Sequence, residues 1–281
     1  MKKNSYETAI VILNWNGGNM TRECVSTIKK YVKESYKIII VDNCSTDNSL
    51  EGLDEGKDLK IIKNKTNEGF VNGNNIGMKF ALNENPSLKY LVLLNNDTLV
   101  TLGWLKNMIR CAKSNKRYGV VGAKQFTFDK KPAISAGNMT FFGVKYIWNK
   151  KITEVDWVSG ACFLIKKEVV EKIGYLNMLY QPIYYEETDF ELRTRKAGFK
   201  VVYCPKSIFY HKGGSDTSIN PAKFSLIFYR NRFIFFYRNK PLYLFSRIPV
   251  DIFRALKNKS LKLLISAYIQ GIKRIYEFKN V

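Results

Sequence analysis

The 281-residue sequence contains a single histidine and five cysteines, too few and too scattered for a disulfide framework or a structural zinc site. The cysteines are odd in number, form no C-x-x-C pair, and three of them lie in or beside apolar runs. This pattern indicates reduced, mostly buried thiols, as in cytosolic proteins. No apolar run reaches the roughly 18 residues that span a bilayer, and a strand pattern follows the first few residues, so we expect neither a transmembrane helix nor a signal peptide.

Glycine-rich phosphate-binding signatures are absent as well. After its first strand pattern, where a dinucleotide-binding protein carries G-x-G-x-x-G, the chain has Asn14-Trp-Asn-Gly-Gly18. It has no P-loop and no Gly-X-Gly-Thr-Arg loop of the nucleotidyltransferase type. These absences argue against a dehydrogenase, a P-loop ATPase and a nucleotidyltransferase. RRM, KH and zinc-finger patterns are missing too, so nucleic acid is not an expected partner.

Acidic residues are few: 24 Asp and Glu stand against 46 Lys and Arg, for a net charge of +22. Residues 221–281 hold thirteen of the basic residues and only two acids, which is half of the net charge. Large aromatic residues are interleaved with them: Phe224, Phe228, Tyr229, Phe233, Phe235, Phe236, Tyr237, Tyr243, Phe245, Phe253, Tyr268 and Tyr276. Such a composition is typical of helices in an anionic membrane interface. The alternative is a solvated basic face on helices packed against a core.

Apolar runs and helical patterns alternate through the first half of the chain. Strands are expected at 8–13, 36–41, 59–62, 88–94 and 119–126, and helices at 19–32, just after Asn48, from the 67–77 loop to Asn83, and at 102–114. This β-α-β-α order predicts an α/β fold with a mostly parallel, doubly wound sheet. Short strands follow, then a helix starting near Glu186 and ending at Gly198, and two strands at 201–203 and 208–210. Residues 1–220 thus form an α/β domain, and residues 221–281 form a helical basic appendage broken at Pro241 and Pro249.

Two acids close predicted strands. Asp42 ends the second strand, and Asp97 follows the buried run Tyr90–Leu94 within Asn95-Asn-Asp97. Ligands of open α/β sheets bind beyond the carboxyl ends of strands. Asp42 could therefore bond a ribose hydroxyl or a base N–H, and Asp97 could hold a hard cation and a diphosphate. A carboxylate at the position of Asp97 could equally be a turn residue or a helix cap.

Three carboxylates, Glu186, Glu187 and Asp189, share one helix start. Like charges this close raise at least one pKa, which suits a general base near neutrality. The structural alternative is that the acids favour the helix dipole and form i,i+4 ion pairs, Asp189 with Arg193 and Glu191 with Arg195.

His211 is the only histidine, and it ends a strand before Lys212-Gly-Gly-Ser215. A lone histidine is often structural. Imidazole and carboxylate together also suit Mn²⁺ or Mg²⁺ when diphosphate oxygens and water complete the coordination shell.

Four segments taken in order resemble the family-two glycosyltransferases of the GT-A fold, most closely the rhamnosyltransferase-like branch. They are Val11-Ile-Leu-Asn-Trp-Asn-Gly17, Val41-Asp-Asn-Cys-Ser-Thr-Asp-Asn-Ser49, Asn67-Glu-Gly-Phe-Val-Asn-Gly-Asn-Asn-Ile-Gly77 and Leu94-Asn-Asn-Asp-Thr98. Trp157-Val-Ser-Gly-Ala161, Tyr185-Glu-Glu-Thr-Asp-Phe190, His211 and Tyr229-Arg-Asn-Arg232 continue the resemblance, which covers about residues 6 to 240.

The resemblance implies a role for each matching position. Donor-binding residues would be Asn14, Asp42, Asn67, Gly69, Asn75, Asn95 and Asn96; metal ligands would be Asp97 and His211; and the sugar and acceptor pocket would include Trp157 and Gly160. Glu187 stands where the family usually has its catalytic Asp, and because Glu is one methylene longer, Glu186 or Asp189 could take the role instead.

The implied activity is inverting transfer of a sugar from a nucleoside-diphosphate donor, dTDP-rhamnose or a UDP-sugar, to a hydroxyl of a lipid-linked or cell-surface glycan, with Mn²⁺ or Mg²⁺. Together with the basic tail, it implies a cytoplasmic enzyme held at the inner face of the cell membrane. The alternative is a non-catalytic protein that binds membranes or polyanions on a degenerate transferase scaffold, which the Glu at position 187 favours.

Overall fold

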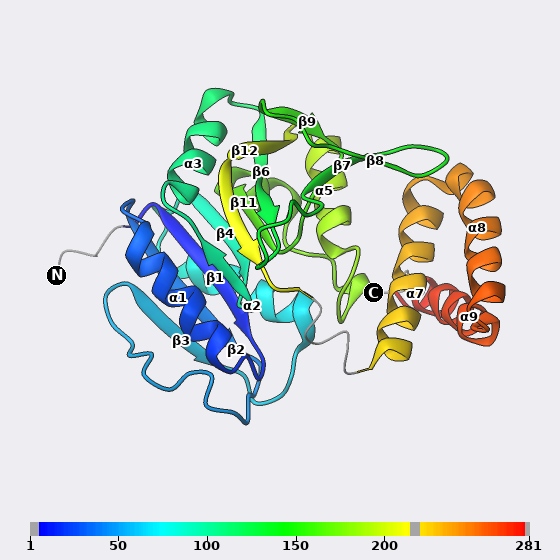
Figure 1. Cartoon of the computed structure of the whole chain (residues 1–281), viewed down its shortest axis with the longest axis horizontal. Coiled ribbons are helices and arrows are strands. Elements are labelled where there is room, and N and C mark those ends of the chain that lie inside the picture. The colour runs from blue at the N-terminus through cyan, green and yellow to red at the C-terminus, as the bar shows by residue number, and fades with distance from the viewer. Residues whose placement is uncertain (1–5, 214–219, 279–281) are drawn as a thin grey trace.

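Four parallel strands form the first half of the central sheet in the computed structural model, which describes residues 6–213 and 220–278 (Figure 1). They are β1 (Thr8–Asn14), β2 (Tyr36–Asp42), β3 (Leu59–Lys63) and β4 (Tyr90–Asn95). Their residues are apolar and largely buried, as expected of parallel strands covered on both faces. Each strand ends at the same edge of the sheet, because the strands run in the same direction.

The second half of the sheet is mixed. Its strands are β5 (Thr98–Val100), β6 (Tyr118–Phe126), β9 (Thr153–Val155), β11 (Cys162–Lys166) and β12 (Lys200–His211). The order is β3-β2-β1-β4-β11-β6-β12-β5, with β9 also paired to β12, giving nine strands within the described residues. β5, β9 and β11 run opposite to the other six. The sheet is therefore mostly parallel, as predicted, but the two strands expected at 201–203 and 208–210 are one strand with an irregularity between Cys204 and Ile208.

Helices cover both faces of this sheet (Figure 1). They are α1 (Asn19–Tyr31), α2 (Gly69–Glu84), α3 (Trp104–Ser114), α4 (Lys167–Ile173) and α5 (Glu186–Lys196). Alternate residues of β1 point to opposite faces: Ile10 and Ile12 pack in one core with α1 and α3, and Ala9 and Val11 pack in the other with α2, α4 and α5. The two cores hold the strand ends in fixed positions.

The C-terminal helices pack onto the α/β core. They are α7 (Pro221–Asn239), the 3₁₀ turn η2 (Pro241–Tyr243), α8 (Leu244–Lys257) and α9 (Leu261–Glu277). A third apolar cluster joins them to α5 and to the 3₁₀ turn η1 (Met178–Tyr180); it contains Leu179, Tyr180, Leu192, Ile234, Phe235, Phe236 and Ile275. Phe235 and Phe236 are thus core residues, as expected of the alternative in which the tail helices pack against a core.

A small second sheet lies beside the contact between the C-terminal helices and the α/β core. Its strands, in order, are β10 (Trp157–Val158), β7 (Ala136–Met139) and β8 (Val144–Tyr146). Its β7–β8 hairpin reaches toward α7 and α8 (Figure 1). Arg247 of α8 donates to the carbonyls of Thr140 and Gly143 in the hairpin, at 2.7 and 2.8 Å. Within the described residues, no helix is both long and apolar enough to cross a bilayer.

Three local expectations were wrong. No helix follows Asn48 in the described residues, because Asp47 bonds the backbone N–H groups of Gly18 and Ser49 in a turn. Most of the loop expected at 67–77 belongs to α2, whose glycines allow close packing: a Cβ at position 73 would lie 2.3 Å from Leu13 Cδ1. Pro249 lies inside α8 rather than breaking it, since the loss of one N–H near the helix start is offset by packing of the buried face.

Candidate active site

Sheet register brings the polar strand ends together. Asn14 of β1 lies opposite Asp42 of β2, and Leu13 lies opposite Asn95 of β4. On the far side of the sheet, β12 pairs with β5 so that His211 lies opposite Thr98. The residues singled out on four separate segments of the sequence therefore meet along one edge.

Asn14 is the centre of a buried hydrogen-bond network at this edge. Its Nδ2 donates to Asp42 Oδ1 at 2.8 Å, and its Oδ1 accepts from the Thr21 hydroxyl at 2.6 Å. Asn96 Nδ2 in turn donates to Thr21 Oγ1 at 3.0 Å. Because Asn14 is fully buried, it orients Asp42 instead of facing a ligand. The same network links Asn96 to Asp42.

Two cavities lie next to Asp42 and the following residue, Asn43. The first, of about 590 Å³ and called here the β2 cavity, is lined by Asp42, Ser45, Asp47, Lys63 and Asn64 among others. The second, of about 560 Å³ and called the Trp15 cavity, is lined by Trp15, Asn43, Asn67, Gly69 and Gln181 among others. The chain segment 42–44 runs along both, so a donor nucleotide could occupy either side of it.

Asn75, the remaining amide assigned to donor binding, faces neither cavity. Its side chain accepts from Leu176 N at 3.0 Å and donates to Leu176 O at 2.9 Å, and it is 3% exposed. Asn75 thus fixes the segment after α4 to α2. Its predicted contact with the donor has no counterpart in this geometry.

Asp97 and His211 lie against each other. His211 Nε2 is 3.1 Å from Asp97 Oδ1, and Asp97 Oδ2 accepts from Gly213 N at 3.1 Å. Burial alone would raise the pKa of Asp97, but the hydrogen bond and charge of His211 and the Gly213 N–H outweigh it, so the pKa is held below its ordinary value. Asp97 is an ionised carboxylate at the edge of the sheet.

The imidazole is fixed by residues that the sequence analysis missed. Gln125 Nε2 lies 3.1 Å from His211 Nδ1, and the Ser159 hydroxyl donates to Gln125 Oε1 at 2.9 Å. Asn95 Nδ2 lies 3.4 Å from His211 Nε2. Ser159 lies in the Trp157–Ala161 segment that carries the resemblance, but no role was assigned to it, and Gln125 is marked only as a polar residue at the end of an apolar strand.

This pair of side chains fits a divalent cation bound together with substrate. In the described part of the chain no cluster of three or more His, Cys, Asp or Glu side chains could hold a metal by itself. One carboxylate oxygen and one imidazole nitrogen are suitable ligands for Mn²⁺, and the remaining positions suit phosphate oxygens and water.

Glu187 lies in the first turn of α5 and lines a third cavity. This Glu187 cavity has a volume of about 390 Å³ and is also lined by Trp157. Gly160 lies directly against the carboxylate arm: a Cβ there would be 3.2 Å from Glu187 Cγ and 3.4 Å from its Cδ. The next residue, Ala161, accepts from Asn95 N at 2.9 Å. Gly160 therefore leaves room for the longer Glu side chain and joins it to the Asp97 edge.

Burial raises the pKa of both carboxyl groups at this helix start. The pKa of Glu186 is raised well above its ordinary value by burial, then by the charge of Glu187. The pKa of Glu187 is raised by burial, while backbone N–H groups and the hydrogen bond from Glu186 act against the rise. Burial thus favours the protonated form of both carboxyl groups, and of the two only Glu187 lines the cavity.

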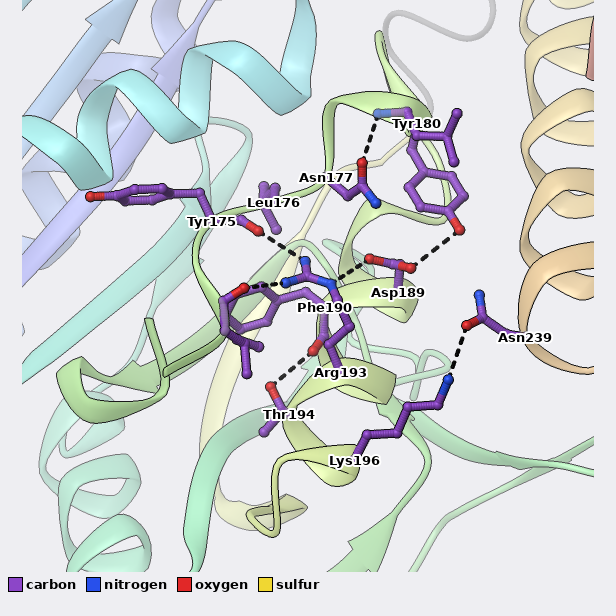
Figure 2. A network of polar contacts seen from close by, with 12 residues as sticks. Tyr175, Leu176, Asn177, Tyr180, Asp189, Phe190, Arg193, Thr194, Lys196 and Asn239 are labelled. Carbon is purple, nitrogen blue, oxygen red and sulfur yellow. Dashed lines mark hydrogen bonds and ion pairs between the residues drawn. The ribbon is translucent and has the colours of Figure 1, made fainter. Parts of the chain in front are cut away.

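Asp189 is engaged in a structural network (Figure 2). Its carboxylate accepts from Arg193 Nε at 2.7 Å and from the Tyr180 hydroxyl at 3.2 Å. Arg193 also donates to the carbonyls of Ile173 and Tyr175, at 2.8 and 2.9 Å. Asp189 is 5% exposed and is not among the residues that line the Glu187 cavity. The expected Asp189–Arg193 ion pair is present.

The second expected pair, Glu191 with Arg195, is not formed. Arg195 instead lies 2.8 Å from Asp156, and Glu191 accepts from the backbone N–H of Val158 at 3.0 Å. Glu191 is fully buried against β10, while Arg195 is half-buried and its guanidinium pairs with Asp156. Burial and the charge of Glu187 raise the pKa of Glu191 well above its ordinary value. Glu191 thereby fixes the strand that carries Trp157.

The tail holds the segment that precedes Glu186. The Asn231 amide of α7 donates to the carbonyls of Tyr180, Ile183 and Tyr184, at 2.7, 2.8 and 3.0 Å. The neighbouring Arg230 donates to Gln181 O at 2.5 Å. Through these hydrogen bonds, the motif Tyr229-Arg-Asn-Arg232 fixes the loop that precedes Glu186 and Glu187.

Known proteins are similar to this chain in sequence. The family model described as Glycosyl transferase family 2 matches residues 9–174, more than half of the chain. The hexosyltransferase Agl10 of low-salt glycan biosynthesis in Haloferax volcanii is 23% identical over 81% of this chain and 75% of its own length. The N-acetylglucosaminyl-diphospho-decaprenol L-rhamnosyltransferase of Mycobacterium tuberculosis is 30% identical, over only 29% of this chain and 26% of its own.

Solved structures share the fold. GalNAc-T7, crystallised with UDP, GalNAc and Mn²⁺, superposes with a TM-score of 0.62 and 16% identity over 84% of this chain and 48% of its own. The mannosyltransferase PcManGT of Pyrobaculum calidifontis, in complex with GDP-mannose and Mn²⁺, superposes with a TM-score of 0.61 and 12% identity over 96% of this chain and 76% of its own. The expected fold class is confirmed, and the chain belongs to glycosyl transferase family 2 as a glycosyltransferase of the GT-A type.

Proposed function

We propose that this protein transfers a sugar from a nucleoside-diphosphate donor to a hydroxyl group of a glycan acceptor, with inversion at the anomeric carbon. The observation that carries the proposal is the 3.1 Å contact between Asp97 and His211 at the sheet edge, between the Asp42 network and the cavity of Glu187. The reaction has three requirements, and each has a candidate group. The Asp42 network would hold the nucleoside, Asp97 and His211 would help to offset the diphosphate charge, and Glu187 would activate the hydroxyl.

Asp42 is proposed to bind the nucleoside, with its orientation fixed by Asn14. Asp97 and His211 would hold Mn²⁺ or Mg²⁺, and a divalent cation bound there would offset the charge that develops on the departing nucleoside diphosphate. Glu187 accepts the proton of the attacking hydroxyl. It is suited to this because burial brings its pKa upward from the ordinary value of 4.5, closer to neutrality.

The donor is proposed to be dTDP-rhamnose or a UDP-sugar, and the acceptor a lipid-linked or cell-surface glycan. Support for the rhamnosyltransferase-like branch and for a lipid-linked acceptor is the short match to the mycobacterial rhamnosyltransferase, whose name specifies a diphospho-decaprenol acceptor.

Attachment to the inner face of the membrane is proposed to occur through the tail, residues 221–281, with residues 1–220 as the catalytic part. The support is an exposed apolar stripe on α9, at the helical spacing i, i+4, i+7, i+11: Ile265, Ile269, Ile272 and Tyr276, which are 51, 49, 45 and 62% exposed. Exposed apolar residues beside many Lys and Arg suit an anionic bilayer surface. The proposed partner of the tail is therefore a membrane surface, and nucleic acid is not proposed.

Thermal-shift screening against nucleotide sugars with and without Mn²⁺ tests the proposal. A donor should raise the melting temperature in the presence of Mn²⁺, and slow donor hydrolysis should accompany it. If no nucleotide sugar shifts the melting temperature while anionic vesicles still bind, the protein is a membrane-binding one on a transferase scaffold.

A further inference from the structure

The Glu187 cavity is walled on one side by the tail, and that wall carries three arginines. Arg232 comes from α7, and Arg247 and Arg254 come from α8. Glu187 is the sole acid among the lining residues in the described part of the chain. Three guanidinium groups thus share one cavity with the carboxylate assigned to proton removal.

Two of these guanidinium groups are buried. Arg232 and Arg247 are 8 and 9% exposed, and a buried charge is costly unless a partner compensates it. Arg232 pairs with Asp251 at 2.7 Å, whereas Arg247 donates to the carbonyls of Thr140 and Gly143 and lies 5.3 Å from the centroid of the Phe236 ring. Among the described residues Arg247 forms no ion pair, and its Nε is buried without a hydrogen-bond partner. Burial and the charge of Arg232 lower the pKa of Arg247, so the pair repel each other. Arg254, by contrast, is exposed.

We propose that Arg232, Arg247 and Arg254 form a subsite for a phosphate or diphosphate group of the acceptor, next to Glu187. The inference rests on the proposed function and specifies its acceptor: a glycosyl phosphate or diphosphate whose hydroxyl faces Glu187. An anion in this position supplies the direct ion pair that Arg247 lacks among the described residues. Arginine also matches phosphate through paired N–H donors.

Helix α8 links this subsite to the proposed membrane face. Arg247, Asp251 and Arg254, at i, i+4 and i+7, lie on the side of α8 toward the cavity and core. Phe245 and Leu256, 76 and 59% exposed, lie on the opposite side by helical spacing. The phosphate could therefore belong to a lipid-linked acceptor or to a water-soluble one, and the two sources predict different affinities.

Calorimetric titration with inorganic pyrophosphate in EDTA tests the subsite on the full chain without requiring turnover. R254Q should weaken binding about tenfold, because it removes a charge-assisted hydrogen bond. R238Q, which removes the same charge from an exposed position of α7 outside the cavity, should bind like the wild type. Unchanged binding by R254Q, or equal weakening by both variants, would overturn the subsite. Melting temperatures check that both variants are folded.

Farnesyl diphosphate distinguishes the source of the phosphate. Tighter binding of farnesyl diphosphate than of pyrophosphate, lost in Leu256→Ser, assigns the subsite to a lipid-linked acceptor; equal affinities assign it to a water-soluble phosphorylated acceptor. Failure of the proposed function can be distinguished from failure of the subsite. In that case the wild type would not hydrolyse any donor, but it would still bind pyrophosphate, and R254Q would still weaken that binding.

Discussion

Replacing Glu187 by Gln should remove most of the transfer activity, whereas the same change at Glu186 should not. Glu187 lines the cavity, whereas Glu186 is 3% exposed and is not among the lining residues. Gln has nearly the volume of Glu, so E187Q removes the base without emptying the site. A positioned general base contributes about 10²–10⁴-fold, which at about 1.36 kcal/mol per tenfold is roughly 3–5 kcal/mol. E186Q should cost less than about tenfold, because Glu186 does not line the cavity and burial favours its neutral form, which the amide resembles.

The assay is kcat/KM for release of the nucleoside diphosphate, measured across acidic and neutral pH. Because burial raises the pKa of Glu187 and the reaction needs its ionised form, activity should fall as the pH drops through a value above 4.5. That acidic limb should disappear from the residual activity of E187Q. D189N provides the control, since loss of the Arg193 ion pair should lower stability and leave the limb in place. Activity retained by E187Q, or lost equally in E186Q, would refute the assignment.

Four further outcomes are expected. D97A should abolish transfer and the melting-temperature increase caused by Mn²⁺ while the protein stays folded; normal turnover would contradict the role of Asp97 as ligand. Q125L should weaken Mn²⁺ binding about 10–100-fold by releasing the imidazole, measured by titration with nucleotide present, and unchanged affinity would show that Gln125 does not orient His211. N231L should lower the free energy of unfolding by about 3 kcal/mol or more, because three carbonyls lose their donor, as measured by urea denaturation; a near-neutral effect would show that water replaces the amide. I269S should reduce sedimentation with anionic vesicles at unchanged melting temperature, whereas the control Asn258→Ser, at an exposed position between α8 and α9, should not. Undiminished binding of I269S would exclude the α9 stripe as the membrane contact.

The sequence by itself determined the α/β class and the place of the site. Apolar runs of parallel-strand type end in Asn14, Asp42 and Asn95, and strand periodicity alone puts such residues at one edge of a sheet. The acids at the start of α5 and the final position of His211 on its strand were also readable. These features depend on interactions between residues near one another in the chain, so local pattern suffices to predict them.

Only the tertiary structure decided what each polar side chain does. Asn14 and Asn75 are both buried amides, yet one orients Asp42 and the other ties α2 to Leu176, because their partners lie far away in the sequence. Glu191 and Arg195 have the spacing of an ion pair, but Glu191 accepts from the Val158 N–H and Arg195 pairs with Asp156 instead.

The same holds for the tail. Composition showed that it is basic and aromatic, but not that Phe235 enters a core with Tyr180 or that Arg232 and Arg254 line the same cavity as Glu187. Periodicity identifies the apolar side of a helix and not the surface that covers it. That surface is chosen by packing between segments more than 40 residues apart, which no local pattern records.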